Sequence, residues 1–88
     1  MANTYLAESI EFQPIEIKLD GAIITTGVQF GVTALGARPP SSWISPTILS
    51  GKIGIMVSGY AAGTWQVWAK VTSAPETPIL DCGYFIVE

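Results

Sequence analysis

Apolar and polar residues alternate with a period of two along most of the chain. The alternation is clearest in residues 65–72, which have one apolar face and one largely polar face. The apolar face consists of Trp65, Val67, Ala69 and Val71, and the opposite face of Gln66, Trp68, Lys70 and Thr72. Successive side chains of a strand point to opposite faces of a sheet, so this pattern predicts a strand with one face in the core.

Similar patterns predict further strands, separated by turn residues at short intervals. They cover residues 15–20, 22–25, 28–34, 53–58 and 79–87, with a short edge strand at 47–50. No segment has sustained helical periodicity. The chain is therefore predicted to be all-β, an immunoglobulin-like β-sandwich of about seven antiparallel strands, with a small open β-barrel as the alternative.

Glycine and proline mark the connections between these strands. Asp20-Gly21 predicts a tight turn, because glycine accepts a positive φ. Residues 36–46 contain three prolines, which lack the backbone donor that a sheet requires, so they predict a long loop. Gly31 lies on the side of its strand opposite Phe30 and Val32, where we expect a bulge or a close neighbour.

The first dozen residues also alternate, and they admit two interpretations. One side carries Tyr5, Ala7, Ser9 and Glu11, and the other Leu6, Glu8, Ile10 and Phe12. Residues 1–12 are then either a strand of the sandwich or an arm that pairs with the sheet edge of another copy. In both interpretations residues 13–88 form the immunoglobulin-like domain.

The charge composition argues against two classes of partner. The net charge is −3, and the four cations are dispersed singly: Lys18, Arg38, Lys52 and Lys70. Nucleic-acid binding requires clustered positive charge, so nucleic acid is not an expected partner. A membrane is not expected either, since the chain has no basic amphipathic helix and no apolar run long enough to span a bilayer.

Low charge also bears on self-association. Only 12% of the residues are charged and 49% are hydrophobic. This composition favours the burial of apolar surface by a partner or by further copies of the chain. The alternative is that the two inner faces of a sandwich require many apolar residues in any case. The N-terminus has no basic start followed by an apolar stretch, so we expect synthesis in a cytoplasm without a signal peptide.

The sequence offers little for common catalytic chemistry, and its seven carboxylates are expected to be solvated surface charges. It has no histidine, which removes the usual general base and the usual metal ligand. Its single cysteine, Cys82, lies in an apolar strand pattern and is predicted to be a small buried residue. Gly51-Lys52 lacks the rest of a phosphate-binding loop. We expect no enzyme activity, no cofactor and no metal site.

Seven residues are candidate contacts for a partner. Four lie in the proline loop, two in the N-terminal segment and one on the polar face of the clearest strand: Arg38, Pro39, Pro40, Trp43, Tyr5, Leu6 and Trp68. A tryptophan in a proline-stiffened loop loses little entropy when a partner fixes it. In the competing interpretations, Trp43 folds back to cap one end of the sandwich, and the N-terminal segment covers Trp68.

Two stretches near the C-terminus have a familiar pattern. Residues 63–72, GTWQVWAKVT, resemble the G-x-Y-x-V-W-x-K-V-T strand of small immunoglobulin-like proteins in the virions of tailed bacteriophages. Residues 73–85, SAPETPILDCGYF, resemble their P-E-x-P hairpin and closing G-x-F strand, and residues 5–12 resemble their opening. The resemblance is best over residues 60–87 and weaker over the proline loop.

This resemblance implies a fold and a role but no catalytic residues. It implies a non-catalytic virion structural protein that decorates or stabilises the capsid through the major capsid protein or other virion subunits. A homo-oligomer within that assembly is also expected. The alternatives are a tail, baseplate or head–tail joining module, or a module that binds carbohydrate or a host surface through Trp43, Trp68 and Tyr60.

Overall fold

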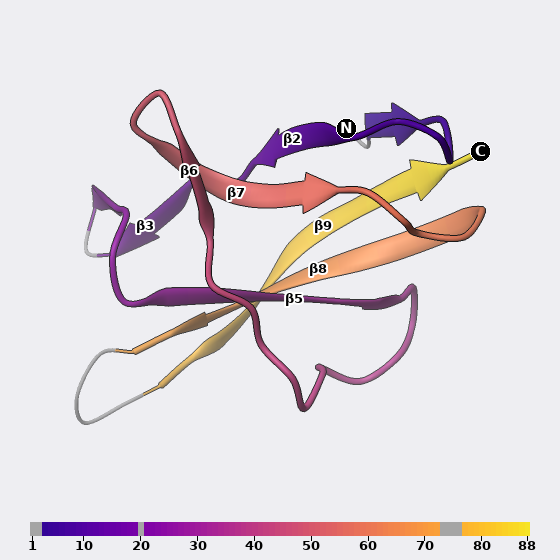
Figure 1. The fold of residues 1–88 in the computed structure, drawn as a ribbon. Coiled ribbons are helices and arrows are strands. Elements are labelled where there is room, and N and C mark those ends of the chain that lie inside the picture. The colour runs from indigo at the N-terminus through magenta and orange to yellow at the C-terminus, as the bar shows by residue number, and fades with distance from the viewer. Residues whose placement is uncertain (1–2, 20, 73–76) are drawn as a thin grey trace.

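The structure, a computed structural model, describes residues 3–19, 21–72 and 77–88. These residues form nine strands and no helix, so none of them belongs to a helix that could cross a membrane (Figure 1). The strands are β1 (Asn3–Tyr5), β2 (Glu11–Pro14), β3 (Ile17–Leu19), β4 (Ala22–Ile24), β5 (Val28–Ala34), β6 (Thr47–Leu49), β7 (Lys52–Val57), β8 (Gly63–Val71) and β9 (Ile79–Val87).

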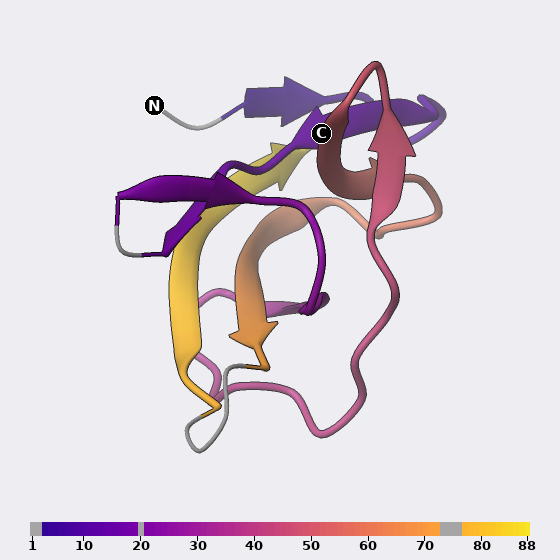
Figure 2. The ribbon, with the colours of Figure 1, turned by 90° about the vertical axis from the view of Figure 1, so that its left-hand side faces the viewer.

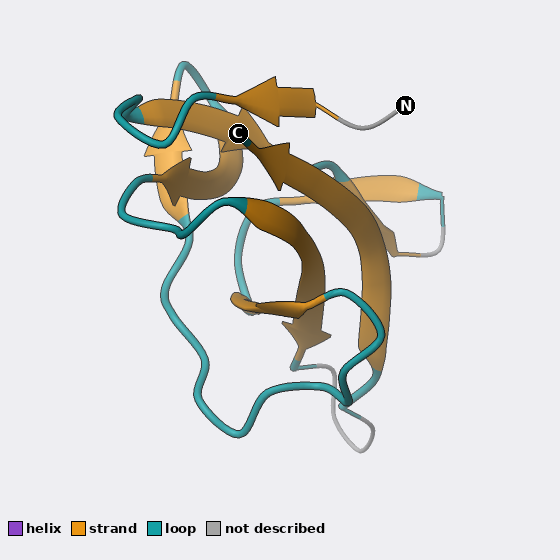
Figure 3. Ribbon diagram, turned by 90° about the vertical axis from the view of Figure 1, so that its right-hand side faces the viewer, coloured by secondary structure: helices purple, strands orange, loops and turns teal. Residues whose placement is uncertain are grey.

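The strands form sheets of four, three and two strands. Their orders are β1-β9-β8-β5, β2-β7-β6 and β3-β4. The all-β prediction is confirmed, and the arrangement is compatible with a β-sandwich. The expectation of about seven antiparallel strands was too simple, because β1 pairs in parallel with β9. Figures 2 and 3 show the long curved strands β8 and β9 side by side, with the shorter elements arranged around them.

The core draws on both of the larger sheets. Its buried residues alternate along their strands as the sequence pattern predicts, with Val67, Ala69 and Val71 on β8 and Ile53, Ile55 and Val57 on β7. The remaining buried hydrophobic residues are Tyr5, Ile17, Val28, Phe30, Phe85 and Val87. Phe30 and Phe85 are among the largest fully buried side chains, so the two strands that flank β8 each contribute a ring to the centre.

Tight turns join the short strands. Leu19 pairs with Ala22, which leaves only two residues between β3 and β4, and Gly21 has a φ of 82°. Asp20, the other half of the predicted turn, lies outside the described residues. Ser50 and Gly51 both have positive φ, at 52° and 75°, as a two-residue hairpin between β6 and β7 requires.

A β-bulge interrupts the pairing of β8 with β9. Trp65 pairs with Phe85 and Gln66 with Tyr84, whereas Trp68 pairs with Asp81, so β9 has one extra residue at this point. Gly83 within the bulge has a φ of 91°. The extra residue reverses the alternation, and Cys82 therefore contacts the core although Phe85 and Val87 also face inward.

The N-terminal segment joins both large sheets instead of forming one strand. β1 is an edge strand of the four-stranded sheet, and β2 pairs with β7 in the three-stranded sheet. A turn closed by the Ser9 N–H donating to the Leu6 carbonyl, at 2.9 Å, separates them. The expected division at residue 12 falls inside β2.

Candidate functional site

The outer face of the four-stranded sheet carries the polar side of β8. In the sheet register, Gly31, Trp68 and Asp81 lie in one row across β5, β8 and β9. Thr33, Gln66 and Tyr84 lie in the next row. We call this surface the tryptophan face, formed by Gly31, Thr33, Gln66, Trp68, Lys70, Asp81 and Tyr84 of the sheet and Pro40 and Trp43 of the proline loop.

The proline loop is fastened to the open edge of β5. The Phe30 N–H donates to the Ile44 carbonyl at 2.9 Å, and the Ile44 N–H donates back to the Phe30 carbonyl at 2.8 Å. Figure 1 shows the loop leaving the end of β5 and passing back across that strand before it enters β6. Pro40 and Trp43 thereby lie over Gly31, which confirms the close neighbour expected there.

Trp68 and Lys70 of β8 each contact a neighbouring residue on the tryptophan face. The Trp68 Nε1–H donates to the Thr33 Oγ at 2.9 Å, which holds the indole toward β5. The Lys70 ammonium lies 5.2 Å from the centre of the Trp43 ring, within the range of a cation–π interaction. Both tryptophans are half-buried, so each is fixed in place and still presents part of its ring to solvent.

The carboxylate of Asp81, on β9, lies next to Trp68 of β8, on the side away from β5. Asp81 accepts a hydrogen bond from the Gly83 N–H at 2.9 Å. This bond, and a second one from the buried Gln66 side chain, hold the pKa of Asp81 below its ordinary value, because both favour the charged form. The tryptophan face therefore presents two indole rings together with one cation and one oriented anion.

The structure brings three of the predicted contact residues together. Pro40, Trp43 and Trp68 all belong to the tryptophan face. Arg38 and Pro39 are exposed on the same loop. Pro40 and Trp43 of this loop cover the sheet at Gly31, beside Trp68. The N-terminal segment does not cover this part of the sheet, because its strand β1 is at the opposite edge. Trp43 lies against the sheet face.

The two N-terminal candidates differ from each other. Tyr5 is 7% exposed and packs edge-on against Phe85, with ring centres 6.0 Å apart. Its hydroxyl donates to the Gln13 side chain on β2. Tyr5 is therefore a core residue here, since its inward position on β1 places it between the sheets, whereas Leu6 is 61% exposed.

The Gln66–Asp81–Gly83 cluster was missed from the sequence. An aspartate two residues before a glycine is typical of a turn in which the carboxylate binds the backbone N–H of the residue two positions on. That signal is present in Asp81-Cys82-Gly83. The part played by Gln66 depends on the strand register, which the local pattern does not reveal.

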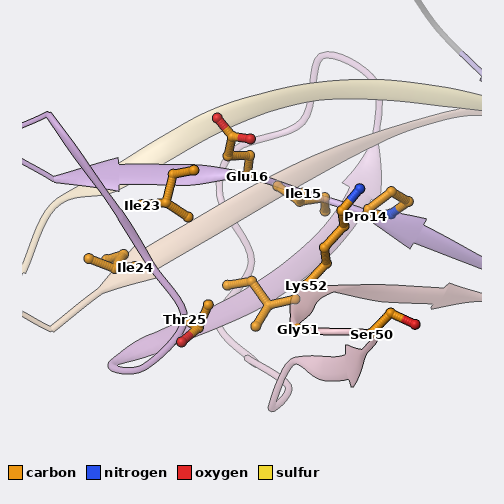
Figure 4. Close-up of a pocket in the computed structure, with 10 residues that line it drawn as sticks. Pro14, Ile15, Glu16, Ile23, Ile24, Thr25, Ser50, Gly51 and Lys52 are labelled. Atoms are coloured by element: carbon orange, nitrogen blue, oxygen red, sulfur yellow. The ribbon is translucent and has the colours of Figure 1, made fainter.

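Away from the tryptophan face, a hollow lies between the β3–β4 hairpin and the β6–β7 turn (Figure 4). It has a volume of about 490 Å³, and Ile15, Ile23, Ile24 and Ile53 contribute apolar walls. Lys52 lies on one side and Glu16 on another. Glu16 pairs with Lys18 at 3.6 Å, between exposed side chains. Such a lining suits a small apolar group, with the polar side chains of Glu16 and Lys52 at its margin.

Cys82 has the properties of a structural residue. Burial, with a smaller contribution from the charge of Asp81, raises the pKa of its thiol to about 11. The thiolate is the reactive form of cysteine, so this thiol is a poor nucleophile near neutral pH. Within residues 3–19, 21–72 and 77–88, no three of the His, Cys, Asp and Glu side chains are grouped so as to hold a metal ion.

No protein-family model matches the chain, and searches of curated proteins and of solved structures find no significant match.

Proposed function

We propose that the chain is a non-catalytic structural protein of a tailed-phage virion, an immunoglobulin-like sandwich that decorates or stabilises the capsid. The observation that carries the proposal is the apolar surface. Eleven large hydrophobic side chains of the described residues are at least 37% exposed, in a chain with few charges. Contiguous exposed apolar surface with few charges is typical of protein–protein contact sites.

The tryptophan face is the surface that we assign to the neighbouring virion subunit. Tryptophan, tyrosine and arginine are the residues that most often dominate binding energy at protein interfaces. Trp43, Trp68 and Tyr84 lie on this face, and Arg38 is exposed on the adjoining loop. The resemblance of residues 63–85 to virion immunoglobulin-like proteins supports the same role.

Particle composition tests the role directly. Virus particles whose genome encodes the chain are purified, and the chain is quantified by mass spectrometry against the major capsid protein. We expect tens to hundreds of copies per particle. Detection only in the lysate, with none in purified particles, would overturn the virion role.

A variant series tests the assigned surface. Trp43→Ala is expected to lower incorporation into particles at least tenfold, because loss of an anchor residue costs about 2 kcal/mol or more. Ser58→Ala, at an exposed position outside the tryptophan face, serves as the matched control. Equal incorporation of both variants would place the contact elsewhere on the chain.

One arrangement on this face also favours a second candidate function, the binding of carbohydrate. Tyr84 is 49% exposed, and it pairs across the strands with Gln66, which bonds the fixed carboxylate of Asp81. An aromatic ring beside oriented polar groups suits stacking on a sugar with hydrogen bonds to its hydroxyls. A glycan array gives a signal that Tyr84→Ala removes if this function is correct, and no signal if it is not.

A further inference from the structure

The N-terminal segment has a sequence pattern that its turn does not match. Residues 5–12 alternate as one continuous strand would, with Leu6, Glu8, Ile10 and Phe12 on one side. In the structure the segment folds back at Leu6–Ser9, whose two central residues are Ala7 and Glu8. Neither is among the residues that favour turns. The fold-back leaves Leu6 61% and Ile10 71% exposed.

The turn separates two short strands that are anchored on different sheets. β1 contributes three residue pairs with β9, and the Glu88 N–H donates to the Tyr5 carbonyl at 2.8 Å. Tyr5 fills a site formed by Phe85 of β9 and Gln13 of β2. The residues that bind β1 thus all lie on, or directly after, other strands of the domain. A single turn, Leu6–Ser9, connects β1 to those strands.

We propose that β1 is exchanged between copies of this chain, with Tyr5 of one copy seated between Phe85 and Gln13 of another. Opening the Leu6–Ser9 turn converts residues 3–14 into one extended arm, and this matches the alternating pattern. The occupant of the site is a second copy, because the segment that fits the site is the chain's own β1. Exchange reproduces the same contacts between copies, which is why it requires little more than opening the turn.

In the extended arm Leu6, Glu8, Ile10 and Phe12 lie on one face. Leu6 and Ile10, which are exposed in the closed form, then lie on either side of Glu8 on a face where copies can pack. The exchange gives the assembly role proposed above a way for subunits to link to each other. It rests on that role for its biological meaning, although its test uses the purified chain alone.

The exchange is tested with two chains that each carry one new cysteine. Both chains carry Cys82→Ala; one adds Thr4→Cys and the other Ile86→Cys, since Thr4 and Ile86 are direct partners across β1 and β9. The two chains are mixed in denaturant, refolded together at high concentration and oxidised. We expect disulfide-linked heterodimers on a non-reducing gel, at a fraction that rises with protein concentration. In the matched control, the second chain carries Thr64→Cys instead of Ile86→Cys. Thr64 is not a direct partner of Thr4, because β9 lies between them.

Heterodimers no more abundant than in the Thr64→Cys control, in chains whose circular dichroism shows refolding, would overturn the exchange. A hinge pair gives a second readout. Glu8→Val favours an extended backbone and Glu8→Gly favours the turn, so the heterodimer fraction is expected to differ between them by about fivefold. An equal fraction in both variants would also overturn it. Neither result bears on particle composition, so failure of the exchange and failure of the virion role are distinguishable.

Discussion

Pro40 lies directly against Gly31, so that a β-carbon at position 31 would overlap the Pro40 ring. Trp43 approaches the same point, with its Cε3 atom 3.3 Å from where that β-carbon would be. Because Gly31 and Trp68 are paired across β5 and β8, the absence of a side chain at residue 31 is what lets the proline loop settle beside Trp68. The tryptophan face depends on this glycine.

Gly31→Ala is therefore expected to destabilise the fold by about 1–3 kcal/mol, through overpacking of the loop against the sheet. Urea denaturation followed by tryptophan fluorescence measures the change. Pro40→Ala removes the overlapping ring, so the double variant is expected to recover part of the loss. Additive losses in the double variant would show that the loop does not pack on Gly31.

Asp81 gives a prediction on pH. The Gly83 N–H and then the Gln66 amide lower the pKa of its carboxyl from an ordinary value of 3.8. The stabilisation from these bonds is present above that value and is lost as the pH falls through the lower pKa of the folded state. An NMR titration of the Asp81 carboxyl should show a midpoint below 3.8, and Gln66→Ala should raise it partway. A midpoint at or above 3.8 in the original chain would contradict both hydrogen bonds.

Much of the fold follows from local pattern. The strand predicted at residues 79–87 matches β9, and the alternation of residues 65–71 gives the correct inward face of β8. Such predictions succeed because burial of one face imposes a period of two on the sequence. Local pattern does not specify pairing partners, which explains why the parallel contact of β1 with β9 was not expected.

The candidate site was predictable only in part. Trp43, Pro40 and Trp68 were recognised as residue types that suit contacts, and the structure brings them to one face. Their proximity depends on the conformation of an eleven-residue loop, and the contact of Lys70 with Trp43 depends on it too. Tyr5 was a candidate contact because residues 1–12 were predicted to be either a strand of the sandwich or an arm for another copy, and its inward position on β1 makes it part of the core.

Cys82 is expected to react slowly with thiol reagents in the folded protein. A pKa of about 11 in place of 9.0 lowers the thiolate fraction at pH 8 by about 100-fold. Iodoacetamide labelling followed by mass spectrometry measures the rate, which should rise steeply in denaturant. Thr72→Cys on a Cys82→Ala background supplies an exposed thiol as the control. Equal labelling rates at the two positions in the folded protein would contradict the burial of Cys82.

Tyr5 links the two larger sheets, and its removal should therefore cost far more than its place near the chain terminus suggests. Tyr5→Phe removes only the hydroxyl that donates to Gln13, with an expected loss of about 1 kcal/mol. Tyr5→Ala also removes the ring that packs on Phe85, with an expected loss of about 3–5 kcal/mol. Leu6→Ala, at the exposed neighbouring position, should change the free energy of unfolding by less than about 0.5 kcal/mol. If all three variants unfold at the same urea concentration as the original chain, Tyr5 does not belong to the core, and the site proposed for strand exchange loses its anchor.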